Sequence, residues 1–220
     1  MLMLGYHKID SVYKRDPADK YKRFLTDQYT RPEFELLKDI DWTWTEKIDG
    51  TNVRVGWDGA AVQFGGRTDA AQMPMRLLTR LQSKFTPELM TQVLGVQGGI
   101  VLYGEGYGPG IQGGGYDTNR EQRFILFDVL ATDQVERPCW FARESVVDFA
   151  GQLGIDIVPV VGHGTIAEAI EFVRVPRQSP CGTRLSEGIV LRPTVELLSR
   201  FGGRIITKLK LRDFVVGQEQ

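Results

Sequence analysis

Two predicted strands meet at the stretch that decides the fold, Glu46-Lys47-Ile48-Asp49-Gly50. Residues Asp41 to Thr45 before it and Asn52 to Trp57 after it have strand composition, and the second alternates apolar residues at every other position. A lysine at a strand end beside an Asp-Gly turn has two interpretations. It is a solvated surface residue, or it is a nitrogen nucleophile. The rest of the chain has to decide between them.

Outward from this stretch, strands adjoin one another more often than they alternate with helices. The predicted strands are Ala61–Phe64, Ile100–Tyr103, Phe124–Leu130, Ile157–Val161, Gly188–Arg192 and Arg204–Leu209, and the predicted helices are Pro74–Leu94 with a restart at Pro87, Phe141–Leu153 and Thr165–Val173. This order favours an α+β fold with antiparallel sheets over a doubly wound fold. We find no internal repeat or linker, so the prediction is a single domain over residues 1–220.

The composition is that of a globular protein, with 42% hydrophobic and 25% charged residues among 220. No window approaches the ~20 apolar residues that a bilayer span needs. The apolar run at the start of the chain is too short for the core of a signal peptide. Cys139 and Cys181 have no metal-ligand spacing, and two histidines argue against a His-based metal site or a Ser-His-Asp triad. We therefore expect a cytoplasmic protein without a membrane partner.

A net charge of −1 argues against nonspecific coating of nucleic acid, but the charge is unevenly distributed. Between residues 174 and 212, two acids stand against nine basic residues: Arg174, Arg177, Arg184, Arg192, Arg200, Arg204, Lys208, Lys210 and Arg212. A positive region of this kind would attract phosphates. The alternative is an ordinary solvated basic surface.

Several motifs along the chain place a charged or aromatic residue at a strand end. In order they are Gly66-Arg67-Thr68, Tyr103-Gly104-Glu105, Phe127-Asp128, Glu187-Gly188-Ile189-Val190 and Lys208-Leu209-Lys210. The two lysines of the last motif alternate with apolar residues and so share one strand face. Each motif alone has a plain structural interpretation, such as a turn acid, a core aromatic or a strand-edge lysine.

Together with Glu46-Lys47-Ile48-Asp49-Gly50, these motifs resemble, in content and order, the six motifs of the covalent nucleotidyltransferase superfamily. That superfamily contains ATP-dependent DNA and RNA ligases and mRNA capping enzymes. The resemblance implies a ligase adenylylation domain, related in type to ATP-grasp folds, whose antiparallel sheets flank a nucleotide cleft. Six ordered matches between Glu46 and Lys210 settle the choice left open for Lys47 in favour of a nucleophile.

Within the superfamily, the chain is most similar to the bacteriophage RNA ligase 2 family of RNA repair enzymes. Thr51-Asn52 after the nucleophile, the glycine-rich segment from Gly104 to Gly114 and the opening Tyr6-His7-Lys8-Ile9 carry this likeness. Residues Gly108 to Gly113 also fit a dinucleotide fingerprint formally. A proline inside it and the lack of a following βαβ pattern argue against that interpretation, so we predict a loop at the cleft.

The resemblance implies roles for individual residues. Lys47 would attack the α-phosphorus of ATP and form lysyl-AMP, while Lys208 and Lys210 supply positive charge at that phosphate. The implied ATP-binding set is Glu46, Lys47, Asn52, Arg67, Glu105, Phe127, Glu187, Lys208 and Lys210. Glu187 is the leading candidate for holding Mg²⁺ or Mn²⁺, and Asp128 has either a metal-binding or a structural role.

AMP would then pass to a 5′-phosphate of RNA, and a 3′-hydroxyl would displace it. The sequence ends ten residues after Lys210, so we expect neither an OB-fold nor a helical C-terminal domain, and we expect a monomer. Three alternatives stay open: a DNA ligase acting on DNA or hybrid nicks, an enzyme that adenylylates ends without efficient sealing, and a non-catalytic nucleic-acid-binding module.

Overall fold

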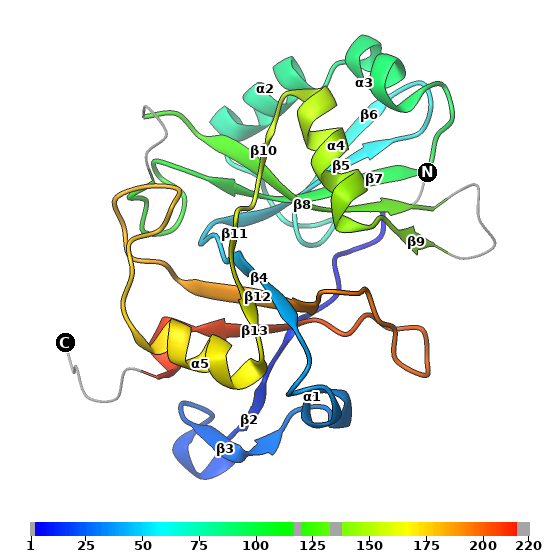
Figure 1. Ribbon diagram of the computed structural model, residues 1–220. Coiled ribbons are helices and arrows are strands. Elements are labelled where there is room, and N and C mark those ends of the chain that lie inside the picture. The colour runs from blue at the N-terminus through cyan, green and yellow to red at the C-terminus, as the bar shows by residue number, and fades with distance from the viewer. Residues whose placement is uncertain (1–2, 117–119, 133–137, 215–220) are drawn as a thin grey trace. The chain divides into compact units, whose positions relative to one another are not determined.

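The computed structural model describes residues 3–116, 120–132 and 138–214, which form two compact units (Figure 1). Unit 1 comprises residues 1–7, 49–158 and 181–183, and unit 2 comprises residues 8–48, 159–180 and 184–220. The chain passes from unit 2 to unit 1 between Ile48 and Asp49, inside the stretch Glu46-Lys47-Ile48-Asp49-Gly50. Each unit contains a mainly antiparallel sheet and at least one helix, which confirms the α+β prediction.

Unit 1 is built on a sheet with the strand order β10-β8-β7-β5-β6, and β9 pairs with β8. Its elements are β5 (Thr51–Trp57), β6 (Val62–Gly65), α2 (Met75–Lys84), α3 (Pro87–Leu94), β7 (Ile100–Tyr107), β8 (Arg123–Ala131), β9 (Cys139–Trp140), α4 (Arg143–Leu153) and β10 (Asp156–Ile157). The three helices lie over one face of the sheet (Figure 1). There Val53, Val55 and Trp57 of β5 pack against Leu77 and Leu81 of α2.

Unit 2 is built on a five-stranded sheet with the order β1-β13-β12-β4-β11. Its elements are β1 (Asp10–Ser11), β2 (Tyr13–Arg15), η1 (Pro17–Asp19), β3 (Phe24–Tyr29), α1 (Pro32–Leu36), β4 (Trp42–Glu46), β11 (Val160–Gly164), α5 (Ile166–Arg174), β12 (Gly188–Pro193), β13 (Thr207–Lys210) and η2 (Leu211–Asp213). Helix α5 starts with a capping box between Thr165 and Glu168. Its buried face contributes Ile166, Ala169 and Ile170 to a core shared with the strands.

Most predicted elements lie within one or two residues of the observed ones. The strand predicted from Arg204 begins three residues later, at Thr207, because Arg204 forms only an isolated bridge with Leu198. Two other exceptions also have local causes. The strand predicted at Ile157–Val161 is two short strands, because β10 pairs with β8 of unit 1 and β11 pairs with β4 of unit 2. Strand β7 runs on to Tyr107, past its predicted end at Tyr103 and into the glycine-rich segment. In that strand glycines pair with neighbours on both sides, so backbone bonding overrides their low strand propensity.

The prediction of one adenylylation domain over residues 1–220 stays a prediction beside these two units. In the part of the chain that the structure describes, no helix has the length and apolar character that crossing a bilayer requires.

Candidate functional site: a lysine–carboxylate cluster

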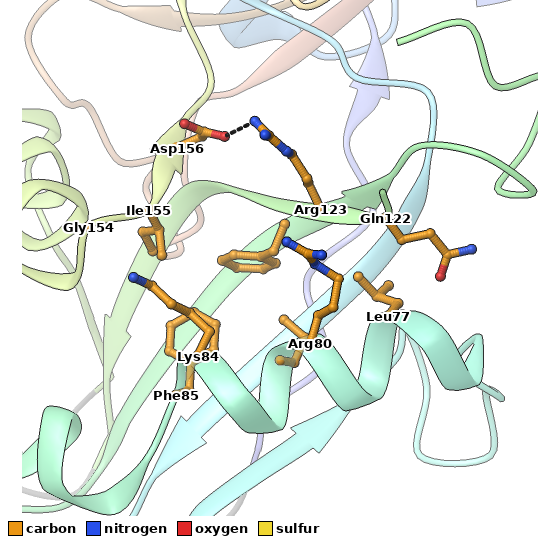
Figure 2. A pocket seen from close by; sticks show the side chains of 11 residues that line it. Leu77, Arg80, Lys84, Phe85, Gln122, Arg123, Gly154, Ile155 and Asp156 are labelled. Carbon is orange, nitrogen blue, oxygen red and sulfur yellow. Dashed lines mark ion pairs between the residues drawn. The ribbon is translucent and has the colours of Figure 1, made fainter. Parts of the chain in front are cut away.

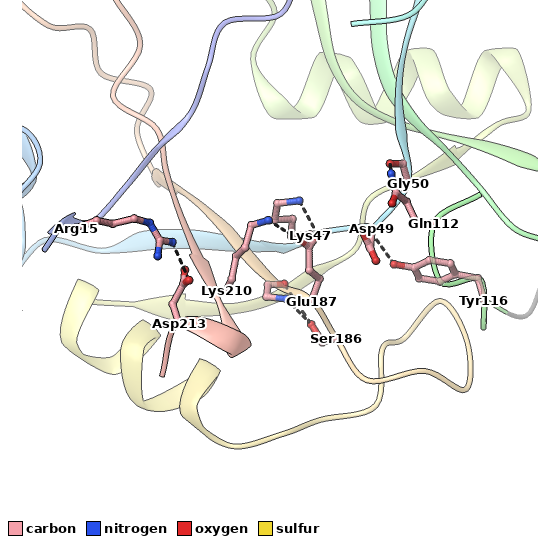
Figure 3. Close-up of polar contacts among 11 residues, drawn as sticks. Arg15, Lys47, Asp49, Gly50, Gln112, Tyr116, Ser186, Glu187, Lys210 and Asp213 are labelled. Carbon is pink, nitrogen blue, oxygen red and sulfur yellow. Dashed lines mark hydrogen bonds and ion pairs between the residues drawn. The ribbon is translucent and has the colours of Figure 1, made fainter. Parts of the chain in front are cut away.

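Three adjacent strand ends of unit 2 bring four of the predicted residues together. We call Lys47, Glu187, Lys208 and Lys210 the lysine–carboxylate cluster. Nζ of Lys47 lies 2.6 Å from Oε2 of Glu187, and Nζ of Lys210 lies 2.6 Å from Oε1 of the same carboxylate (Figure 3). Their side chains are 14–23% exposed, so these ion pairs are largely shielded from water.

The register of the sheet explains this arrangement. Strand β12 runs between β4 and β13, with Ile189 opposite Glu46 on one side and Gly188 opposite Lys210 on the other. Glu187, one residue before β12, therefore lies between the end of β4 and the end of β13. The backbone N–H of Lys47 donates to the carbonyl of Gly188 at 2.9 Å, which extends the ladder past β4.

Gly188 is required for this geometry, although the sequence analysis gave it no role of its own. Its φ of +148° is disfavoured for residues with a side chain. A Cβ at this position would lie 2.0 Å from the carbonyl oxygen of Leu209 on β13. The glycine thus allows a close backbone approach beside Glu187, and the acid-glycine pair in the sequence was the available signal for it.

The predicted alternation of β13 is confirmed. Thr207 and Leu209 are fully buried, whereas Lys208 and Lys210 are only partly buried and share the other face. Burial lowers the pKa of Lys208, and the ammonium groups of Lys210, Lys47 and Lys8 lower it further. Burial by itself would raise the pKa of Glu187, but the adjacent Lys47 and Lys210 outweigh it and the pKa is lowered. The cluster is therefore a carboxylate surrounded by cations.

Glu46 lies next to the cluster on β4 but is directed to different partners. Its side chain is 3% exposed and accepts a hydrogen bond from Oγ of Ser186 at 3.0 Å. Burial raises the pKa of Glu46, against the opposing hydrogen bonds from Ser179 and Ser186. Sequence reasoning missed both serines, although Ser186 directly precedes the Glu187 motif.

The other predicted residues belong to unit 1, where two of them form a cross-strand pair. Asn52 of β5 lies directly opposite Glu105 of β7 in the antiparallel register. Side chains of directly opposed residues lie on the same face of a sheet. Oδ1 of Asn52 is buried and has no hydrogen-bond partner among the described residues, so this amide can still accept a hydrogen bond.

A β-bulge in β8 places Phe127 beside Asp128. The register runs from Tyr103 opposite Asp128 to Gly104 opposite Leu126, which leaves Phe127 as the extra residue. Such a bulge re-aims side chains that would otherwise alternate. Both residues accordingly contact Tyr6, whose ring lies 5.0 Å from the Phe127 ring and whose hydroxyl donates to Asp128 at 2.5 Å.

Asp128 is fully buried in this network. The opposed Tyr103 has its pKa raised to about 12, mainly by burial, and the Asp128 charge adds to the effect. Of the two roles considered for Asp128, this setting supports the structural one. Sequence reasoning found the acid but neither the bulge nor Tyr6.

Arg67 is exposed on the turn that follows β6, and a buried arginine of β5 holds that turn. The guanidinium of Arg54 donates from Nε to the carbonyl of Gly66 at 2.6 Å, from Nη1 to that of Met3 at 2.6 Å, and from Nη2 to Asp69 at 2.8 Å. Arg54 has 2% side-chain exposure, so its guanidinium is shielded from water, whereas the side chain of Asp69 is 92% exposed. Sequence reasoning did not select Arg54.

The glycine-rich segment secures the Asp49-Gly50 turn from within unit 1. The backbone N–H of Asp49 donates to the hydroxyl of Tyr116 at 2.6 Å, and Nε2 of Gln112 donates to the carbonyl of Gly50 at 3.2 Å (Figure 3). The next described element is strand β8, as expected of a loop and not of a dinucleotide-binding βαβ unit.

The basic stretch of residues 174–212 is less uniformly exposed than the sequence suggests. Arg204 has 2% side-chain exposure and pairs with Glu196 at 2.6 Å, so it adds nothing to a charged surface. Arg177 stacks over the ring of Phe172 at 3.9 Å, whereas Arg174 pairs with Glu171 at 2.5 Å but keeps 49% of its side chain exposed. Only part of this stretch is available to phosphates, since packing and internal pairing involve the rest.

The motifs in their observed geometry can now be set beside known proteins. The RNA ligase family model matches residues 40–210, which include every motif described above. The chain belongs to the RNA ligase family. A comparison with curated protein sequences finds no match, so the bacteriophage-type assignment within this family has no support of that kind.

Solved RNA ligases share the fold. A Naegleria gruberi RNA ligase variant with ATP and Mn superposes with a TM-score of 0.67 at 16% identity, over 94% of this chain and 56% of that one. A second variant, with AMP and Mn, gives 0.66 at 16% identity with the same coverage. A third, without ligand, gives 0.64 at 16% identity, over 96% of this chain and 58% of that one. This chain thus spans little more than half the length of these relatives.

Proposed function

We propose that this RNA ligase family member is an ATP-dependent RNA ligase that forms lysyl-AMP on Lys47, passes AMP to an RNA 5′-phosphate and seals that end to a 3′-hydroxyl. One observation carries the proposal: Lys47 and Lys210 lie 2.6 Å from opposite oxygens of the partly buried Glu187, with Lys208 on the same strand face as Lys210. Cations concentrated around a nucleophilic lysine suit attack on a phosphate and stabilise its charge in the transition state.

In the proposed first step, the neutral Nζ of Lys47 bonds to the α-phosphorus of ATP. The bond from that phosphorus to the bridging oxygen of the β-phosphate breaks, and pyrophosphate leaves with the electron pair. Lys47 loses one proton before attack and a second on forming the phosphoramidate, and both go to solvent. Lys208 and Lys210 supply positive charge at the α-phosphate. The acceptor Oδ1 of Asn52 supports a place for this residue in nucleotide binding.

Glu187 would hold a divalent cation of the Mg²⁺ class through water, because a lysine is paired with each of its oxygens. Such an ion is commonly held by one or two carboxylates together with water and substrate phosphates. Glu187 supplies one largely shielded carboxylate, and among the described residues no group of three His, Cys, Asp or Glu forms a protein-only cage. Mg²⁺ or Mn²⁺ bound there would supply charge neutralisation to the phosphates. Asp128 is not needed for this arrangement.

The test is covalent labelling with α-labelled ATP and Mg²⁺. Wild type should retain label on the protein and Lys47→Ala should retain none, while Lys22→Ala, an exposed lysine outside the cluster, should label normally. GTP in place of ATP tests the choice of nucleotide. Label that persists in Lys47→Ala, or is absent from wild type, would overturn the proposal.

Sealing is tested separately with 5′-phosphorylated nicks in RNA, DNA and hybrid duplexes. The RNA proposal predicts joined product with the RNA nick first. Accumulated AMP-capped 5′ ends without joined product would replace the proposal with an end-adenylylating enzyme. Preferred joining of the DNA nick would replace it with a DNA ligase. Gel filtration across a range of protein concentrations checks the proposed monomer.

A further inference from the structure

A pocket lies within unit 1 and shares no residue with the predicted nucleotide site. Its volume is about 340 Å³, at the lower end of the range for ligand pockets. One wall is a face of α2, and the others are the start of β8 and the loop that leads into β10 (Figure 2). All of its lining residues belong to unit 1.

The floor of this cavity is apolar and firmly packed. Leu77, Leu81 and Phe85 have at most 2% exposure, and Phe124 has 9%. The rings of Phe85 and Phe124 meet edge to face with centroids 5.6 Å apart. These side chains belong to the core of unit 1, so a ligand could displace them only by disrupting the packing of that core. It also leaves too little exposed ring surface for a nucleobase to stack on.

The rim carries three cations from two different elements. Arg80 and Lys84 are four residues apart on α2 and therefore share a helix face, and Arg123 starts strand β8. In Figure 2, Arg80 and Lys84 project from α2, and Arg123 extends from β8 toward Asp156. The side chains of Arg80 and Arg123 are 46% and 36% exposed, and Lys84 is exposed and has no ion pair among the described residues.

Two acids pair with these cations, so three cations and two carboxylates leave the rim with a net charge of +1. Glu121 pairs with Arg80 at 2.8 Å, and Asp156 pairs with Arg123 at the longer distance of 3.8 Å. Both carboxylates are about half exposed, and exposed ion pairs of this kind are weak. A phosphate can compete for either guanidinium through two parallel hydrogen bonds. Lys84 has no ion pair among the described residues, so it can bind a phosphate without first releasing a carboxylate.

From these features we infer that Arg80, Lys84 and Arg123 form a phosphodiester-binding subsite that holds an RNA strand on unit 1. Partly exposed cations above a buried apolar floor can contact successive backbone phosphates of a nucleic acid. Such contacts gain free energy by releasing counterions from the phosphates. An enclosed site for a free nucleotide would need a face for its base, which this floor lacks. The inference rests on the proposed function, because RNA is the source of the phosphates.

The test measures the affinity of the full chain for a 5′-phosphorylated single-stranded RNA by fluorescence anisotropy between 50 and 300 mM salt. Each phosphate contact to a single strand contributes roughly 0.7 to the slope of log K against log salt. Lys84→Gln should therefore lower the slope by ~0.7 and weaken binding about 5-fold at 0.1 M salt. Arg80→Gln with Lys84→Gln should lower it by ~1.4 and weaken binding roughly 25-fold.

The control is Lys22→Gln, which removes an exposed lysine of unit 2 that does not line the cavity. It should change neither the slope nor the affinity relative to wild type. An unchanged slope in the double variant, or an equal loss in Lys22→Gln, overturns the inference. Titration with inorganic phosphate and with AMP separates the sources of phosphate. If these anions bind wild type but not Lys84→Gln, and Lys84→Gln binds RNA as tightly as wild type, the pocket binds free anions and the inference is wrong.

Labelling of Lys47 by ATP in the same variants keeps the two proposals distinguishable. The subsite predicts full label in the double variant with weakened RNA binding. If wild type takes no label, the proposed function fails, whereas the salt-slope comparison still decides whether the pocket binds RNA.

Discussion

Replacing Glu187 by glutamine should destabilise unit 2 more than replacing either cation beside it. The carboxylate has an ammonium group 2.6 Å from each oxygen, so its removal leaves Lys47, Lys208 and Lys210 without a compensating charge. Breaking a buried pair by removing one partner costs about 3–5 kcal/mol, and we reduce this to about 2–3 kcal/mol because the groups keep some solvent. At ~2–4 °C per kcal/mol for a chain of this size, the Tm should fall by about 4–12 °C.

Lys210→Met is the informative partner of this change. It leaves the pair of Lys47 and Glu187 intact and relieves repulsion among the lysines, so the expected loss is below about 1 kcal/mol. The double variant should lose less than the sum of the two single losses, with a coupling of at least ~1 kcal/mol.

Urea titrations followed by tryptophan fluorescence give the four free energies of unfolding, and an unchanged m value confirms that the midpoints report stability. Equal losses in the two single variants, or strictly additive losses in the double variant, would refute the picture of one acid balancing several cations.

Three further predictions test separate parts of the structure. Because burial raises the pKa of Glu46, its favourable contribution is complete below the ordinary value of 4.5 and is lost as pH rises through the raised pKa. Glu46→Gln should therefore gain in Tm relative to wild type between pH 5 and pH 8 in thermal scans. Gly188→Ala should lose more than ~2 kcal/mol in urea titrations, whereas Gly151→Ala, whose added Cβ meets nothing within 4 Å in α4, should gain roughly 0.5–1 kcal/mol. Arg54→Met should slow ATP labelling at temperatures where the variant is still folded, because it releases the turn that carries Arg67. A labelling rate equal to that of wild type would contradict the role of Arg54 in holding this turn.

The parts of the fold that followed from the sequence are those governed by local pattern. Alternation predicted β5 and the two-faced β13, a short apolar run predicted β12, and helical spacing with a proline restart predicted α2 and α3. The segment before Asp41 gave no such pattern, and it contains β1 to β3 and α1. Strand β1 has two residues and pairs in parallel with β13, nearly two hundred residues away. A contact of that kind leaves no local signal.

The same distinction applies to the site. The sequence pointed to Lys47, Glu187 and Lys210 through their motifs, but their pairing depends on β12 lying between β4 and β13. Phe127 and Asp128 were visible as neighbours, yet their common contact with Tyr6 depends on a bulge that only the register with β7 shows. Arg54 looked like an ordinary polar residue in an alternating strand, because its three acceptors are backbone or loop groups.

The Glu187-Gly188 motif is required by the fold as well as by the chemistry. Strand β12 must pair with β4 and β13 at once, and the carbonyl of Leu209 leaves no space for a Cβ at the first residue of the strand. A bulkier residue there would force β12 away from β13, and Glu187 would move away from Lys210 with it. The acid could still reach Lys47 in that case, but the balance between the two lysines would be lost. The glycine therefore fixes which cations share the carboxylate, and we expect Gly188→Ala to weaken the coupling between Glu187 and Lys210 even where the chain still folds.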